Sequence, residues 1–265
     1  MMERLLMLRL EAAGCTAEAW LNGVPIARVS PEQPTRLLPV HEFAVAGTND
    51  IALIVHPALP GMPPEPQAQL SDGKAWASVQ LLLPRMGQIS HPSNARTLAQ
   101  LQWQVPDGEV YETPLCTVGQ VELPIAFPRW RWFDAPVVQD IPAAKVQAVK
   151  LLQRLAVDLA RGEPESFVAA ARLRFEELAL AYQRQPADEL GRFRVGVQAL
   201  RRAPSFKPVL TSAATLLLRP VAGGRLLECL AADGQAALRG EHENGTLRLW
   251  PVRLAFVEGQ PHVLR

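Results

Sequence analysis

The sequence predicts a two-domain α+β protein, in which an antiparallel β-sandwich precedes three helices that pack on an antiparallel β-meander. Short alternating segments with tight turns fill the first half, the apolar period becomes helical from Ala143, and the last strands are separated by glycine-containing turns. A length of 265 residues also suits two domains. We therefore expect domains at residues 1–140 and 141–265.

The clearest local signal in the first half is the pair Asn22-Gly23, which separates the apolar segments 17–21 and 24–29. A two-residue hairpin turn needs positive φ at both positions, and Asn and Gly tolerate this best. The pattern predicts a β-hairpin. A second turn is expected at Gly47-Thr48-Asn49-Asp50, before an apolar strand that ends near His56.

The segment from Met7 to about His56 has a strand ending in Trp-Leu-Asn-Gly-Val, a Pro-Val lead-in, and Ala-Gly-Thr-Asn-Asp-Ile before an apolar strand. This pattern is similar to the galactose-binding-like jelly-roll sandwiches. The resemblance implies a jelly-roll-like first domain. Such domains bind sugars, bind proteins or act as spacers, so a fold resemblance alone selects no function.

Residues 57–74 contain five prolines and are expected to form a loop, because proline lacks the N–H that regular structure requires. A surface insertion is the favoured interpretation, and a segment that binds a partner is the alternative. Further strands are predicted at 75–83, 98–105 and 120–125, with the spacing of a sandwich.

Aromatic and basic residues alternate from Arg129 to Trp132. In an extended conformation Trp130 and Trp132 share one face, and Arg129 and Arg131 take the other. The two indoles are the best candidates in this half for stacking on a sugar or docking a peptide. Large aromatic side chains are usually buried, however, so a role in a core or a domain junction is favoured.

The second half predicts three helices from apolar residues at spacings of three and four. The first has a stripe from Val146 to Leu159, the second runs from Phe167 to Tyr182, and the third follows Pro186. Five strands are then expected, separated by turns that contain glycine. Their ranges are 211–219, 225–231, 235–239, 246–257 and 260–265.

Helices followed by a curved sheet resemble the NTF2-like α+β folds. That resemblance implies a pocket on the concave side, for which Tyr182, Trp250, Phe256 and His262 are candidate lining residues. NTF2-like folds normally place strands between the second and third helices, whereas Gln185-Pro186 connects them directly here.

Charge divides the chain: residues 1–140 carry 9 basic and 14 acidic side chains, a net of −5, and residues 141–265 carry 18 and 12, a net of +6. A net of +6 without a reading motif argues against nucleic acid as the partner. The three cysteines are far apart in the sequence, which predicts neither disulfides nor a metal site. No sequence motif calls for a cofactor or a catalytic set.

The N-terminal segment Ala12-Ala13-Gly14-Cys15 resembles a lipoprotein cleavage box, with Cys15 as the lipidated residue. Arg9 and Glu11 interrupt the apolar run that such a leader needs, and Met7 to Glu11 alternates like a strand. We therefore expect a cytoplasmic, bacterial-type protein. No apolar run is long enough to insert in a membrane.

These patterns favour a non-enzymatic protein that binds another macromolecule, most simply a protein. An accessory, chaperone or toxin-neutralising immunity protein of a bacterial secretion system is one example. Two alternatives stay open: an NTF2-like domain that binds or converts a small molecule, and a carbohydrate-binding module that uses Trp130 and Trp132.

Overall fold

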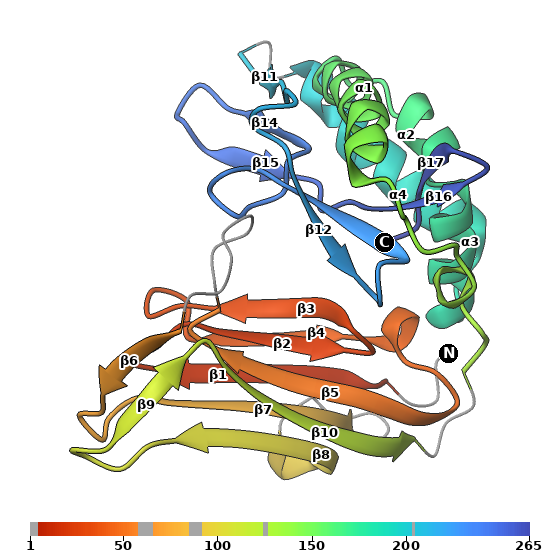
Figure 1. Ribbon diagram of the computed structural model, residues 1–265. Coiled ribbons are helices and arrows are strands. Elements are labelled where there is room, and N and C mark those ends of the chain that lie inside the picture. The colour runs from red at the N-terminus through yellow and green to blue at the C-terminus, as the bar shows by residue number, and fades with distance from the viewer. Residues whose placement is uncertain (1–4, 58–65, 85–91, 124–126, 203–204) are drawn as a thin grey trace. The chain divides into compact units, whose positions relative to one another are not determined.

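The computed structural model describes residues 5–57, 66–84, 92–123, 127–202 and 205–265. The chain divides into two compact units, Met1–Arg129 and Trp130–Arg265. Strands dominate the first unit, and helices followed by strands make up the second (Figure 1). The α+β class predicted from the sequence is therefore confirmed.

Unit 1 consists of antiparallel strands. They are β1 (Met7–Ala13), β2 (Ala17–Leu21), β3 (Val24–Val29), β4 (Thr35–Pro39), β5 (Gly47–Val55), β6 (Gln67–Leu70), β7 (Trp76–Pro84), β8 (Ala95–Gln104), β9 (Val110–Thr113) and β10 (Leu115–Leu123). Single 3-10 turns occur at His41–Phe43 and Pro92–Asn94.

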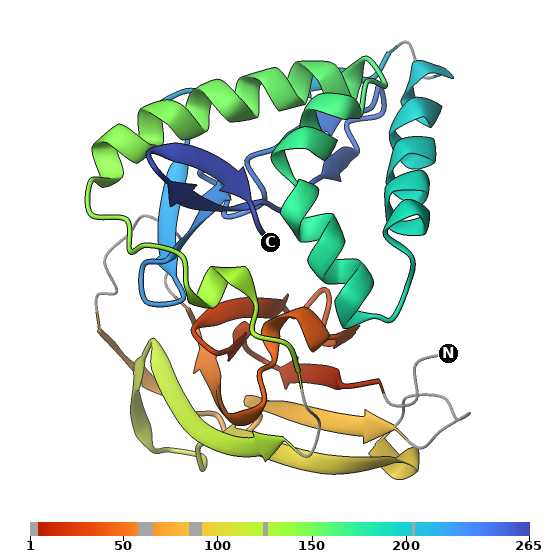
Figure 2. The same ribbon diagram turned by 90° about the vertical axis from the view of Figure 1, so that its right-hand side faces the viewer.

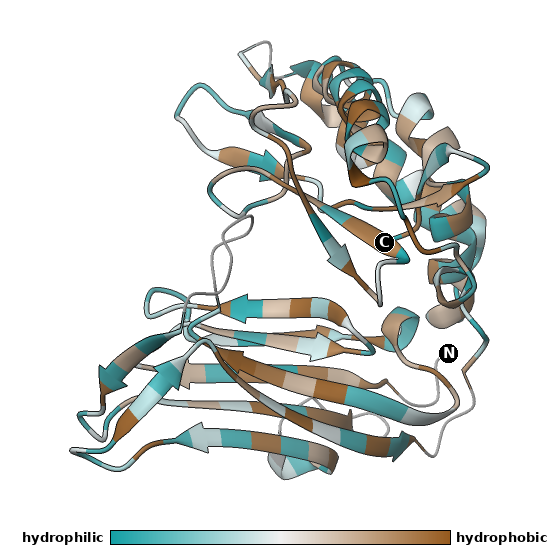
Figure 3. Ribbon diagram, in the orientation of Figure 1, coloured by the Kyte–Doolittle hydropathy of each residue, from teal (hydrophilic) through white to brown (hydrophobic). Residues whose placement is uncertain are grey.

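Two four-stranded sheets of unit 1, ordered β4-β1-β7-β8 and β10-β5-β2-β3, lie face to face, and β6 and β9 form a separate ribbon (Figure 1). Side chains of β1, β2, β5 and β7 that point between the sheets are almost fully buried. Every second residue of β10 is exposed, and hydrophilic and hydrophobic residues alternate over its last four positions (Figure 3). This alternation is the pattern of a sandwich whose outer faces are exposed.

The hairpin predicted at Asn22-Gly23 is confirmed: β2 pairs with β3, and Asn22 and Gly23 have φ of 51° and 73°. The turn predicted at Gly47 to Asp50 is wrong, because these residues already belong to β5 and pair with β10. The sequence pattern predicted a turn because it contains Asn49, but this residue binds its neighbours through its side chain and does not form a turn.

Asn49 is fully buried and organises the chain before β5. Its Oδ1 accepts hydrogen bonds from Val45 N and Asn22 Nδ2, both at 2.8 Å, while its Nδ2 donates to Val45 O at 2.8 Å and Gly47 O at 2.9 Å. Asn22 in turn accepts from Asp50 N through Oδ1. The two amides thereby fix the approach to β5 with neutral groups.

The long loop predicted at 57–74 is interrupted by β6, which pairs with β9. Residues 58–65 of that prediction lie outside the described residues, as do the last two residues of the strand predicted at 120–125. That strand begins earlier than expected, since β10 starts at Leu115.

Unit 2 opens with the 3-10 turn Arg131–Phe133 and continues with helices α1 (Ile141–Ala160), α2 (Glu165–Ala170), α3 (Arg172–Ala181) and α4 (Pro186–Gln198) and a 3-10 turn at Ala199–Arg202. The strands that follow are β11 (Lys207–Val209), β12 (Leu217–Val221), β13 (Leu226–Leu230), β14 (Arg239–Glu241), β15 (Leu247–Leu249), β16 (Arg253–Val257) and β17 (Gln260–Val263).

Two features of unit 2 differ from the prediction. The expected second helix is divided at Ala171, whose φ of −107° and ψ of 14° lie outside the α-helical region. The final strands form two small sheets, β11-β14-β15 and β12-β13-β16-β17, rather than one meander. The pattern of apolar residues continues without interruption in both places. The sequence therefore could not reveal that the helix and the sheet are each divided.

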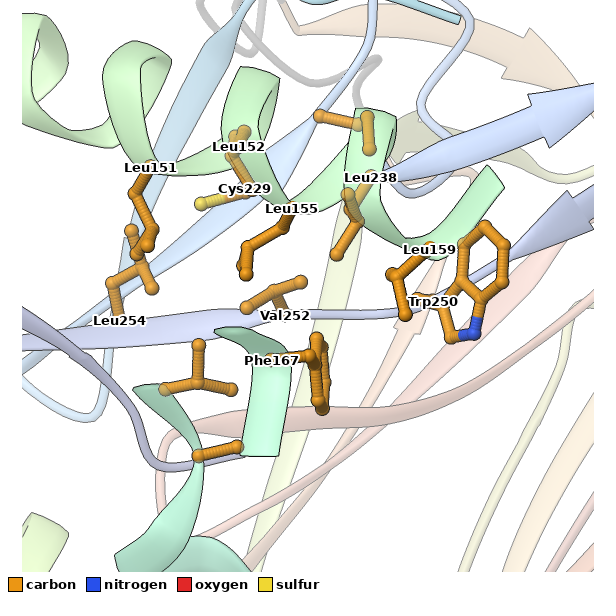
Figure 4. Close-up of a cluster of buried hydrophobic side chains, with 14 of the residues drawn as sticks. Leu151, Leu152, Leu155, Leu159, Phe167, Cys229, Leu238, Trp250, Val252 and Leu254 are labelled. Atoms are coloured by element: carbon orange, nitrogen blue, oxygen red, sulfur yellow. The ribbon is translucent and has the colours of Figure 1, made fainter. Parts of the chain in front are cut away.

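The core of unit 2 lies between the helices and the sheets. Leu152 and Leu155 of α1 meet Cys229 of β13, Leu254 of β16 and Phe167 of α2 (Figure 4). The buried stripe of α1 runs through Ala144, Ala148, Leu151, Leu152, Leu155, Ala156 and Leu159. Val146 was expected on this face, but its side chain is 54% exposed.

Candidate binding site

The outer face of the sheet β10-β5-β2-β3 carries a hollow of about 670 Å³ within unit 1. Residues of β2, β5 and β10 form most of its lining. They are Trp20, Gly23, Asp50, Ile51, Ala52, Ile54, Cys116, Val118, Gly119 and Gln120. The volume lies in the range of pockets that hold small ligands or single side chains of a partner.

Strand register explains why these residues meet. Ala52 pairs with both Val118 and Trp20, so the three form one row across β10, β5 and β2. Ile54 and Cys116 form the next row. Because alternate residues of a strand share a face, both rows project to the same side of the sheet. Val118 is 73% exposed.

Polar groups border this apolar surface. Gln120 Nε2 donates a hydrogen bond to Asp50 Oδ1 at 2.9 Å across the β10-β5 pair. On the far side, Trp20 Nε1 donates to Glu18 Oε2 at 2.9 Å. The hollow therefore combines aliphatic and aromatic carbon with fixed carboxylate and amide groups, a combination that orients a ligand while burying its apolar part.

Cys116 is the one nucleophilic side chain in the lining, and burial raises the pKa of its thiol. Burial also raises the pKa of Cys15 to about 11. The reactive species of cysteine is the thiolate, so at neutral pH Cys116 contributes a neutral, weakly polar surface to the hollow.

Strand β10 lies at the edge of its sheet. Its residues pair with β5 from Leu115 to Leu123, and no strand in the described part of the chain pairs with its other side. An open edge presents a row of backbone N–H and C=O groups, which a further strand can pair with. The edge and the hollow are adjacent, because Cys116, Val118 and Gln120 belong to β10.

Trp130 and Trp132 do not lie on an exposed strand face. The 3-10 turn Arg131–Phe133 replaces the expected extended conformation, and each indole is only 1% exposed. Trp132 packs against Phe133 with ring centroids 4.0 Å apart. Such burial leaves no ring surface on which a sugar could stack.

Arg131 contributes to an ionic cluster in unit 2. Its backbone N–H donates to Glu177 Oε1 at 2.7 Å, and the other oxygen, Oε2, accepts from Arg265 Nη1 at 2.6 Å. The side chains of Arg265 and Glu177 are 1% and 7% exposed. The Arg265 guanidinium also lies 5.7 Å from the centre of the Trp130 ring. The cluster ties together three segments far apart in the sequence.

A second buried carboxylate, Glu228 of β13, is held between two arginines. Arg219 Nη2 approaches Glu228 Oε2 to 2.5 Å, and Arg253 Nη2 approaches Oε1 to 2.9 Å. Such a pairing satisfies both oxygens of a buried carboxylate. The sheet β12-β13-β16 thus carries its buried charge in a structural role.

The other predicted site residues have different surroundings. Arg129 is exposed, Tyr182 lies 5.4 Å below the Arg184 guanidinium, and Trp250 packs on Phe206. Phe256 packs against the core of unit 2. His262 of β17 is half-buried and lines an open groove beside α1, which includes none of the other predicted residues.

Sequence reasoning missed the hollow. The sequence did contain a signal for the hollow. Cys116 and Val118 are apolar residues at alternate positions of β10, on a face of the strand that is otherwise polar. Recognising it required the register that places Ala52 and Trp20 in the same row.

No group of His, Cys, Asp and Glu that could hold a metal ion occurs within the described ranges. In the same ranges, no helix is both long and apolar enough to cross a membrane. Comparisons with known protein families, with curated proteins and with solved structures find no match to this chain.

Proposed function

We propose that this protein is a non-enzymatic binding protein that engages an extended segment of a partner protein along β10. The observation that carries the proposal is the open edge of β10 beside the apolar hollow. A peptide that adds a strand to a sheet gains affinity from backbone hydrogen bonds, and specificity from pockets that take alternate side chains. Both elements occur together at this edge.

The proposal includes the finer fold of unit 1. Two opposed antiparallel sheets with a long strand at the edge support a jelly-roll of the galactose-binding-like kind. The NTF2-like alternative for unit 2 has less support, because strands β11 to β17 all follow α4. An accessory, chaperone or immunity role in a bacterial secretion system is compatible with capture of an extended segment.

A displayed library of random peptides tests the proposal on the full chain. We expect the selected peptides to alternate apolar and polar residues and to bind in an extended conformation. Val118→Lys should weaken their binding at least about tenfold, because it places a charge in the apolar row. Affinity is measured by titration calorimetry.

Val110→Lys is the matched control, because Val110 is 68% exposed but lies on the β6-β9 ribbon, outside the hollow. It should leave the affinity unchanged. Failure to select any peptide, or equal weakening by both substitutions, would contradict the proposal.

A glycan is the second candidate occupant, favoured by the Trp20 indole in the same hollow as Asp50 and Gln120. Aromatic rings stack on sugar faces, and carboxylate and amide groups bind hydroxyls. A glycan array distinguishes the glycan from the peptide. Glycan binding that is lost in Asp50→Ala but retained in Val110→Lys supports the glycan. If the protein binds no glycan on the array, this candidate is excluded.

A further inference from the structure

A second depression lies entirely within unit 2, between α1, the end of α2 and β17. It is an open groove of about 1010 Å³ (α1 lies across β17 in Figure 2). Its lining combines basic, amide and apolar side chains. The residues are Ala143, Val146, Gln147, Lys150, Leu151, Arg154, Ala169, Ala170, Gln260, Pro261 and His262.

The charged groups of the groove are all basic. Lys150 and Arg154 are four residues apart on α1, so they are neighbours on one face of the helix, and both are exposed. His262 contributes an imidazole from β17. No aspartate or glutamate belongs to the lining, and neither Lys150 nor Arg154 forms an ion pair with any described residue.

Several surface arginines of unit 2 have an acidic partner, unlike Lys150 and Arg154. Arg131, Arg184 and Arg194 lie on the surface, and each has a glutamate within 3.0 Å. Two like charges one helical turn apart repel each other unless an anion lies between them. The groove therefore presents positive charge that the described protein does not neutralise.

The groove also contains carbon surface. Val146 is 54% exposed, although a valine on a helix gains from burial. Ala169, Ala170 and Pro261 add small apolar groups from α2 and β17, and Leu151 lies at the base. Gln147 and Gln260 provide amides that donate and accept hydrogen bonds.

We infer that this groove binds an organic phosphate with an apolar body. The phosphate lies between Lys150, Arg154 and His262, which together offer several N–H donors, and the body covers Val146 and Pro261. Phosphate suits this set because its oxygens accept from more than one cationic group at once. The site is distinct from the hollow of unit 1 and does not depend on the function proposed there.

The test uses 1-naphthyl phosphate as the probe and the full chain, labelled for heteronuclear NMR. We expect saturable shifts of amides in residues 143–154, 169–170 and 260–262. The neutral analogue 1-naphthol and inorganic phosphate should each bind at least about tenfold more weakly, since each lacks one half of the ligand. Shifts centred elsewhere, no saturation, or equal affinity for inorganic phosphate would overturn the inference.

The double variant Lys150→Ala, Arg154→Ala is expected to weaken 1-naphthyl phosphate at least about tenfold, as loss of charge-assisted hydrogen bonds requires. Lys145→Ala is the matched control, because Lys145 is on the same helix but outside the lining. Equal effects of the two variants would overturn the inference. The shift map of the unmodified chain decides the question even if the double variant fails to fold.

Discussion

The Asn22–Asn49 cluster of unit 1 and the Glu177–Arg265 cluster of unit 2 both join separate segments of the chain, but they use different chemical groups. Each places buried polar side chains where separate segments meet. Asn49 binds backbone groups two and four residues away, and Asn22 connects this stretch to the hairpin 27 positions earlier. The ionic cluster connects residues 46 and 88 positions apart. The junction in unit 1 is thus held by neutral hydrogen bonds, and the junction in unit 2 by charged groups.

The largest effect is expected from breaking the ionic cluster. Glu177→Gln leaves the Arg265 guanidinium, 1% exposed, without its carboxylate. We expect the free energy of unfolding to fall by about 3–5 kcal/mol, the usual cost of removing one partner of a buried ion pair. Urea denaturation followed by tryptophan fluorescence measures the loss. Glu176→Gln is the control, since its side chain is 38% exposed and its pairs are worth less than about 1 kcal/mol.

A smaller loss is expected from the amide cluster. Asn49→Ala removes four hydrogen bonds and leaves the half-buried Val45 N–H without its partner, which should cost about 2–3 kcal/mol. Hydrogen exchange should accelerate near Val45. Asn94→Ala, at an exposed position, should change neither quantity. If Asn49→Ala cost more than Glu177→Gln, the contrast between the clusters would be reversed.

The third expectation concerns pH. The amides do not titrate, but His56 of unit 1 is half-buried, and burial lowers its pKa. The unfolded chain therefore binds a proton at a higher pH than the folded chain does. The contribution of His56 to the free energy of unfolding is therefore fully present above the ordinary histidine pKa of about 6.5. It is lost as the pH falls below that value.

Asn replaces His56 with a neutral residue that tolerates its φ of 48°. The urea midpoint of His56→Asn should therefore vary less than that of the unmodified chain between about pH 5.5 and about pH 7.5. This range extends roughly one unit to either side of the ordinary histidine pKa. An unchanged pH dependence would assign the effect to other groups.

The smallest effect on stability is expected from the basic groove. Lys150→Ala with Arg154→Ala should change the free energy of unfolding by no more than about 0.5 kcal/mol, because both side chains are exposed and unpaired by any described acid. A thermal melt checks this. A loss comparable to that of Glu177→Gln would show that these cations also maintain the fold.

The sequence was most informative where structure is local. The Asn22-Gly23 turn and the start of α1, where Asp140 caps the helix through Ala143 N, depend on residues within a few positions. The start of β5 at Gly47 was missed, because its pairing with Leu123 of β10 is distant in the chain. A composition that favours turns is overridden when a long-range partner is present.

The candidate sites were harder to predict for the same reason. His262 was identified from sequence, but its neighbours Lys150 and Arg154 are more than 100 positions away. Trp130 and Trp132 are both buried, as the sequence favoured, but the 3-10 turn that positions them was not expected. Residue type indicated which side chains matter, and only the fold showed which of them meet.

The open edge of β10 has a practical consequence for handling the protein. An unpaired strand accepts any extended chain, including the same strand of a second molecule, and so favours association in concentrated solutions. Glu122, near the end of β10, is exposed and would bring one negative charge from each molecule to such a pair. Solubility should therefore improve at low ionic strength, where like charges repel over longer distances.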